Sequence, residues 1–177
     1  MRAYLLEKFY EFSTWPYQTF FKCKTKAWNL TIWDLIHFDD GTLGYDLGVF
    51  LQNNGFLPQD KLESHDVFHV LTGSGVAVPE EVSMQFYLYG NGKRSAYLYM
   101  VMIIGAVFYP DKYQQFKYAY KQGEKSKPFH QLEFRDLLTT PTLELRTKYC
   151  IHDNTYKPLE ISAIDYLLLK FKQLKTK

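Results

Sequence analysis

Residues 64–73 read SHDVFHVLTG, and this stretch decides how the chain is expected to fold. His65 and His69 are four positions apart, so on a helix they share one face, with their Cβ atoms about 5–6 Å apart. Gly73 is expected to end this helix, because glycine is common just past the last helical residue. A second helix is predicted at Pro79-Glu80-Glu81, with proline in its first turn. The short turn between them predicts two antiparallel helices, with the start of the second near His69.

The rest of the chain carries the same helical periodicity. Turn signals separate segments of helical length, and the only strand-like run, Val76-Ala77-Val78, is too short to matter. Apolar stripes at helical spacing occur at Leu43, Leu47, Phe50 and Leu51, at Tyr113, Phe116 and Tyr120, and at Ile164, Leu167, Leu168, Phe171 and Leu174. The pattern predicts an all-α fold, a single-domain helical bundle spanning residues 1–177.

Composition limits the function classes. A chain of 177 residues fits one domain with one core. The net charge of +2 argues against a dedicated nucleic-acid binder. The two cysteines, Cys23 and Cys150, are far apart in sequence, which favours a reducing compartment over a disulfide framework or a thiolate metal site. The start of the chain does not read as a signal peptide.

Two segments bear on membrane contact. Residues 95–110 carry no charge, but the run is shorter than the roughly 20 apolar residues that a spanning helix needs. We therefore expect a buried helix there. Residues 170–177 contain four lysines behind the stripe of residues 164–174. That pattern fits an interfacial amphipathic helix, and it fits equally a helix packed on the core with a solvated tail.

The histidine pair suggests a metal site. Two imidazoles one helical turn apart can converge on one ion, as in the HExxH helix of zinc proteases. A carboxylate from Glu81, or as a second choice Glu80, would complete a set of nitrogen and oxygen ligands that suits zinc and also iron(II). The remaining histidines, His37, His130 and His152, are interpreted as structural.

Asp66 leaves three roles open. It points about 100° around the helix from His65, so its short side chain does not obviously reach the same ion. It is a metal ligand through local distortion, a partner that orients an imidazole, or a catalytic base.

The motif H-D-x-x-H, followed by eleven residues and then Glu81, resembles the signature of the Coq-four family of coenzyme Q (ubiquinone) biosynthesis proteins. Flanking segments also resemble that family, at residues 41–45 (GTLGY), 143–146 (LELR) and 149–151 (YCI). The resemblance covers about residues 38–151, and residues 152–177 form a basic C-terminal extension. Two departures are Glu80, where the family has glycine, and Gly123-Glu124, where it has Gly-Arg.

The resemblance implies an all-helical protein with a divalent metal, zinc first and iron(II) or another ion next, held by His65, Asp66, His69 and Glu81. Asp66 is the candidate catalytic residue. The resemblance further implies a pocket for a prenylated quinone precursor lipid and a cytoplasmic, peripheral location at the inner face of the membrane. The implied activity is oxidative decarboxylation of a prenylated aromatic acid, which is a lyase-type reaction.

The alternative functions are a lipid-binding scaffold for other quinone-biosynthesis proteins and a paralogue that serves another pathway. A homodimer is one option for the assembly, and no nucleic-acid partner is expected.

Overall fold

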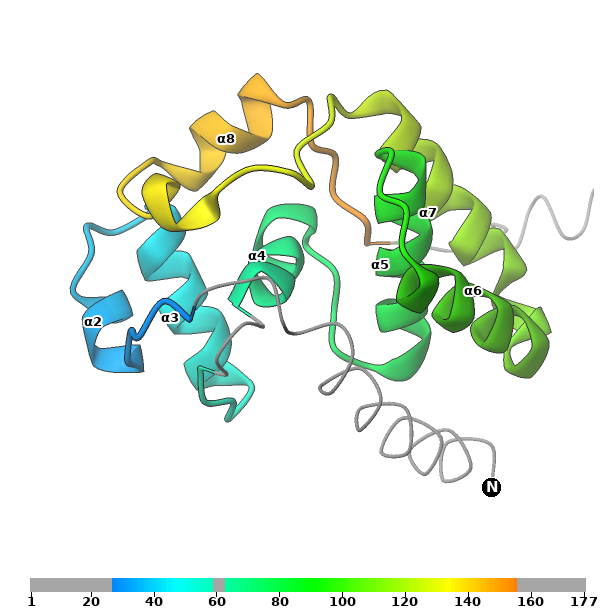
Figure 1. Cartoon of the computed structure of the whole chain (residues 1–177), viewed down its shortest axis with the longest axis horizontal. Coiled ribbons are helices and arrows are strands. Elements are labelled where there is room, and N and C mark those ends of the chain that lie inside the picture. The colour runs from blue at the N-terminus through cyan, green and yellow to red at the C-terminus, as the bar shows by residue number, and fades with distance from the viewer. Residues whose placement is uncertain (1–26, 59–62, 156–177) are drawn as a thin grey trace, which may run out of the picture.

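The computed structural model describes residues 27–58 and 63–155 (Figure 1). This part of the chain forms seven α-helices and two short 3₁₀ helices, and the sole β pairing within it is an isolated bridge between Thr42 and Pro141. The prediction of an all-α, single-domain fold is therefore confirmed. The predicted stripe at 164–174 and the lysine-rich tail lie outside the described residues.

The helices follow one another with short connections. They are α2 (Ile32–Ile36), α3 (Leu43–Asn53), α4 (Glu63–Thr72), α5 (Val78–Gly90), α6 (Ala96–Phe108), η2 (Pro110–Lys112), α7 (Tyr113–Lys125), η3 (Phe134–Leu137) and α8 (Thr142–Lys148). In Figure 1, α4 lies in the middle, with α2, α3 and α8 to its left and α5, α6 and α7 to its right.

The core forms around the apolar faces of α3 and α4. Leu43, Leu47 and Leu51 of α3 are buried, which confirms the predicted stripe. Phe68 of α4 makes edge-on ring contacts with Phe129 and Phe134, whose own side chains are fully buried. These contacts hold α4 between its neighbours and leave its other face available for the histidines.

Helix α5 packs closely along α7. At Gly123 of α7, an added Cβ would collide with the carbonyl group of Tyr87 on α5. The Tyr87 hydroxyl lies 2.6 Å from the hydroxyl of Ser126 and accepts a hydrogen bond from the backbone amide of His152. Phe116 of the predicted α7 stripe is buried, whereas Tyr113 at the helix start is exposed.

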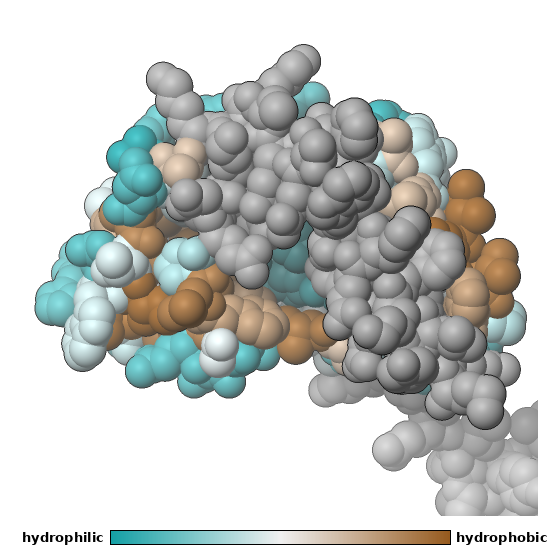
Figure 2. All heavy atoms as spheres, turned by 60° about the horizontal axis from the view of Figure 1, so that its bottom comes forward, coloured by the Kyte–Doolittle hydropathy of each residue, from teal (hydrophilic) through white to brown (hydrophobic). Residues whose placement is uncertain are grey.

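The expectation that residues 95–110 form a buried helix is wrong in one respect. The helix exists as α6, but within it only Leu98 and Gly105 are buried, while Ile103 and Val107 are 65% and 70% exposed. The reason is that α6 packs chiefly against α5, where an added Cβ at Gly105 would collide with Val82, and this contact covers only one side of the helix. Figure 2 shows apolar surface at the end of the molecule where α6 lies. Within the described residues, no helix is both long and apolar enough to cross a membrane.

Candidate metal centre

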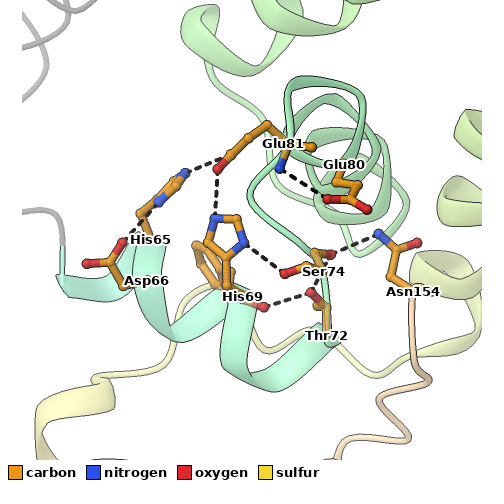
Figure 3. A network of polar contacts seen from close by, with 10 residues as sticks. His65, Asp66, His69, Thr72, Ser74, Glu80, Glu81 and Asn154 are labelled. Atoms are coloured by element: carbon orange, nitrogen blue, oxygen red, sulfur yellow. Dashed lines mark hydrogen bonds and ion pairs between the residues drawn. The ribbon is translucent and has the colours of Figure 1, made fainter. Parts of the chain in front are cut away.

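Three side chains from α4 and α5 converge at the centre of the molecule (Figure 3). The Nε2 atom of His69 lies 3.1 Å from Oε1 of Glu81, and Nε2 of His65 lies 3.5 Å from Oε2 of the same carboxylate. Each residue offers one ligand atom, and these three atoms lie within 4.8 Å of one another. The group could hold a metal ion, and its three members are among the ligands that the sequence predicts.

The turn between the helices places Glu81 in this group. Helix α4 ends at Thr72, and the next residue, Gly73, has a φ of +65°, a conformation that favours glycine. Helix α5 then begins at Val78, and the carboxylate of Glu80 accepts a hydrogen bond from the backbone amide of Ala77, 3.1 Å away. Glu80 thus caps its own helix, and Glu81, one position later, faces the histidines. The structure leaves the second-choice ligand Glu80 outside the group.

The orientation of His69 is held on two sides. Its Nδ1 lies 3.1 Å from the carbonyl oxygen of Ser74, and its ring stacks on Phe50 with centroids 5.3 Å apart. A carbonyl oxygen can only accept, so Nδ1 carries the proton and donates it. The lone pair of a neutral His69 ring is therefore on Nε2, the atom that faces Glu81.

His65 is held in the same way by a carboxylate. Its Nδ1 lies 3.4 Å from Oδ1 of Asp66, while its Nε2 faces Glu81. Asp66 is therefore next to the ring nitrogen that does not point into the site, and it is not one of the three grouped residues. A carboxylate in that position fixes the tautomer and the ring direction of a metal-binding histidine.

The electrostatics of the group favour a cation. Burial alone would lower the pKa of His65. The hydrogen bonds to Asp66 and Glu81 outweigh this effect and raise the pKa to about 9. Burial raises the pKa of Glu81, but its contacts with His65 and His69 outweigh this effect and lower the pKa to about 2. At neutral pH Glu81 is ionised and attracts positive charge, supplied by a proton on His65 or by a metal ion in its place.

The donor set fits a divalent transition metal. Ligand atoms about 2.0–2.1 Å from zinc in a tetrahedral site are about 3.3 Å apart. The two nitrogen–oxygen distances, 3.1 and 3.5 Å, go to different oxygens of Glu81, and one ligand atom from each residue lies within 4.8 Å of the others, so the three side chains need only small shifts to reach one ion. Without a shared proton or ion, the Nε2 lone pair of a neutral His69 would face a carboxylate oxygen, which is repulsive. Two nitrogens and one carboxylate suit zinc or iron(II) better than magnesium.

A buried network holds the loop that carries the Ser74 carbonyl. The Thr72 hydroxyl donates to the carbonyl of Phe68 and accepts from Ser74, and the Ser74 hydroxyl accepts from the amide of Asn154, 3.0 Å away. Asn154 also donates its backbone amide to the carbonyl of Thr72. Sequence reasoning missed Asn154 and Phe50 as supports, because neither belongs to a motif with the histidines.

The other three histidines stay away from this group. Nδ1 of His37 lies 2.5 Å from the carbonyl of Trp33, and Nδ1 of His130 lies 3.2 Å from the side-chain oxygen of Asn91. The backbone amide of His152 donates to Tyr87. Each has a local structural contact, in line with the sequence interpretation.

Comparisons with known proteins give the fold. No protein-family model matches the sequence, and a search of curated proteins finds none that matches. A solved structure of a "putative ubiquinone biosynthesis protein" from Nostoc punctiforme is similar, with a TM-score of 0.58 and 17% sequence identity. The similarity covers 76% of this chain and 74% of that one. This chain therefore shares its helical fold with that protein over about three quarters of both chains.

Proposed function

We propose that this protein is a metal-dependent ubiquinone-biosynthesis protein that acts on a prenylated aromatic acid precursor. The observation that carries the proposal is the convergence of His65, His69 and Glu81, with both imidazoles turned by other groups so that Nε2 faces the carboxylate. The signature that resembles the Coq-four family supports the pathway, as does the naming of the Nostoc punctiforme protein as a putative ubiquinone biosynthesis protein.

The proposed reaction is oxidative decarboxylation of the ring. The carboxyl group leaves as carbon dioxide, a hydroxyl group from water takes its place, and dioxygen accepts the two electrons and two protons released and becomes hydrogen peroxide. Zinc is our first choice of metal and iron(II) the second, and either one supplies Lewis acidity toward the ring oxygens when bound. The three ligand side chains leave coordination positions open for substrate.

The chain's own groups position the site. Asp66 orients His65, the Ser74 carbonyl orients His69, and Phe50 shields one face of the His69 ring from water. We assign Asp66 this positioning role in preference to direct ligation. The third sequence hypothesis, a catalytic base, predicts that Asp66→Asn lowers turnover at unchanged metal content.

Metal content and turnover test the proposal separately. Purified protein should carry about one equivalent of metal by elemental analysis and native mass spectrometry, and His69→Ala should lose it. His37→Ala is the matched control, because His37 is an exposed histidine at the end of α2 whose ring contacts Trp33 and lies outside the metal-binding group. Metal-loaded protein should convert the acid precursor, and His69→Ala should not. A His69→Ala protein with full metal content and full activity would refute the proposal.

A second candidate function is a non-catalytic lipid-binding scaffold for other quinone-biosynthesis proteins. It is favoured by a separate pocket of about 580 Å³ between α5, α6 and α7. Aromatic side chains dominate its lining, including Tyr89, Tyr109, Phe116 and Tyr120, beside Met102 and Lys117. Such a pocket suits a prenyl chain. Co-purified prenyl lipid with stoichiometric metal but no turnover would favour the scaffold.

We further propose peripheral contact with the inner face of the membrane. The exposed apolar side chains of α6, including Ile103 and Val107, support it, because a prenylated substrate leaves a bilayer at a cost of about 0.8 kcal/mol per CH₂. The aromatic pocket is lined in part by α6, so a substrate could enter it from the membrane side.

A further inference from the structure

A second polar site lies beside His69, in an open pocket of about 630 Å³ between α3, the α4–α5 loop and α8. We call it the Arg146 pocket, after the arginine of α8 that lines it. Of the three grouped metal ligands, only His69 reaches its wall. Phe50, which stacks on His69, and Val70 give it apolar sides.

Two residues that line the Arg146 pocket each carry a polar atom that has no hydrogen-bond partner and is not reached by solvent. Thr142 and Arg146 are four positions apart on α8, so their side chains share one face of that helix. The Thr142 hydroxyl oxygen and the Arg146 Nε are both buried and both unpaired. Unpaired buried polar groups are rare, and two of them on residues of one pocket point to a ligand whose binding turns both side chains toward it and gives each atom a partner.

The charge in this pocket favours an anion. One guanidinium nitrogen of Arg146 donates to the carbonyl of Val70, 2.7 Å away, and no carboxylate of the described residues forms an ion pair with the group. Asp46 of α3 lines the same pocket without pairing with Arg146. The guanidinium therefore keeps its charge and its Nε donor for a ligand, and its planar fork matches a carboxylate.

We propose that the Arg146 pocket binds the carboxylate of an aromatic acid. On binding, small side-chain rotations expose Arg146 Nε and the Thr142 hydroxyl, which donate to the carboxylate oxygens, and the ring rests against Phe50 and Val70. This assignment rests on the proposed function for identifying the acid as the substrate. A phosphate group offers similar anionic oxygens, but the apolar walls favour a ring that bears a carboxylate.

Binding of benzoate and of inorganic phosphate to chelator-treated, metal-free protein tests the site without turnover. Calorimetry or amide chemical shifts should show benzoate binding that Arg146→Gln weakens by about tenfold or more and Thr142→Val by about threefold. Lys148→Gln is the matched control. It removes a charge from the same short helix, but Lys148 does not line this pocket, so benzoate binding should not change.

Two further variants separate recognition from structural support. Arg146→Lys retains a charge and a donor for the Val70 carbonyl but loses the fork, so it should stay folded and still bind benzoate severalfold more weakly. Asp46→Asn removes the nearby negative charge and should strengthen benzoate binding. Local damage to the fold would not produce that gain.

Unchanged benzoate affinity in Arg146→Lys and Asp46→Asn would overturn the inference, as would tighter binding of phosphate than of benzoate. The failure of this site and that of the proposed function are distinguishable. Stoichiometric metal with benzoate binding that is independent of Arg146 removes only the Arg146 pocket. Benzoate binding that depends on Arg146 in a protein that never holds metal removes only the metal centre.

Discussion

His69 donates its Nδ1–H to the carbonyl oxygen of Ser74, five residues later, at a distance of 3.1 Å. The turn that ends α4 thus folds back onto the last histidine of the same helix and selects which ring nitrogen faces Glu81. The Ser74 side chain in turn bridges Thr72 and Asn154.

Ser74→Ala should therefore loosen the metal centre without touching a ligand. It keeps the carbonyl but leaves the buried amide of Asn154 without its acceptor, a loss of about 1–3 kcal/mol in the free energy of unfolding. Metal affinity should fall up to about tenfold, since the ring is less firmly held. Urea unfolding and competitive chelator titration measure both. Unchanged stability would show that the bridge contributes nothing.

Asp66→Ala should weaken metal binding by about 10–100-fold while leaving one metal per chain at saturation, because it removes the partner of the His65 Nδ1–H. Asp66→Asn retains an acceptor oxygen and should recover part of the affinity. Asp40→Ala, an exposed acid, is the control. Complete loss of metal in Asp66→Asn would instead assign Asp66 as a ligand.

The stability of the metal-free protein should depend on pH through His65 and Glu81. The pKa of His65 is raised from 6.5 to about 9, so its contribution is complete below pH 6.5 and is lost as the pH rises through 9. The pKa of Glu81 is lowered from 4.5 to about 2, so its contribution is complete above pH 4.5 and is lost as the pH falls through 2.

Both contributions to the free energy of unfolding are therefore complete between pH 4.5 and 6.5. They arise from the same contact between His65 and Glu81, so the two contributions do not add. Urea unfolding in the presence of a chelator should show the alkaline decline, and His65→Gln should reduce it. Between pH 6.5 and 9, metal binding should also release a proton from His65, which calorimetry in buffers of different ionisation enthalpy detects. An alkaline decline of the same size in His65→Gln would contradict the assignment.

Gly123→Ala should destabilise the fold by about 1–3 kcal/mol, because the new Cβ would press against the Tyr87 carbonyl where α7 meets α5. The higher helix propensity of alanine, about 1 kcal/mol, opposes this only in part. Gln114→Ala, exposed on the same helix, is the control and should change stability by less than about 0.5 kcal/mol. Thermal unfolding checks both, and a stabilised Gly123→Ala would show that the helices can separate at little cost.

Replacing both Ile103 and Val107 with asparagine should lower binding to lipid vesicles on the order of tenfold, since both side chains are exposed on α6. Stability should barely change, because neither side chain is buried in the core. Leu143→Asn, equally exposed on α8, serves as the control. Vesicle sedimentation measures the effect. Equal losses in the α6 and α8 variants would remove α6 as a specific membrane contact.

The helix–turn–helix around the site could be predicted from sequence because its determinants are local. Histidine spacing, Gly73 and Pro79 each act within one helical turn, and together they bring Glu81 to the imidazoles. Which of Glu80 and Glu81 faces the histidines is harder to predict, because it depends on which carboxylate accepts the hydrogen bond from the amide at the start of α5.

Two features could not be predicted because they depend on distant parts of the chain. Apolar character predicted the α6 helix, but how many neighbours it packs against is a property of the whole fold, and its outer face is exposed. Arg146 contacts the Val70 carbonyl and Asn154 contacts Ser74 across 76 and 80 residues, separations at which no periodic pattern exists.

The bond from Asn154 to the α4–α5 loop also has a consequence for how the protein is made. The ligand-bearing helices are close in sequence and leave the ribosome before Asn154, so they can pair while synthesis continues. The residue that fastens their connecting turn emerges some 80 positions after Ser74. A nascent chain can therefore pair the two helices before the turn between them is fixed. The turn gains its hydrogen bonds to Asn154 only after that residue has been synthesised.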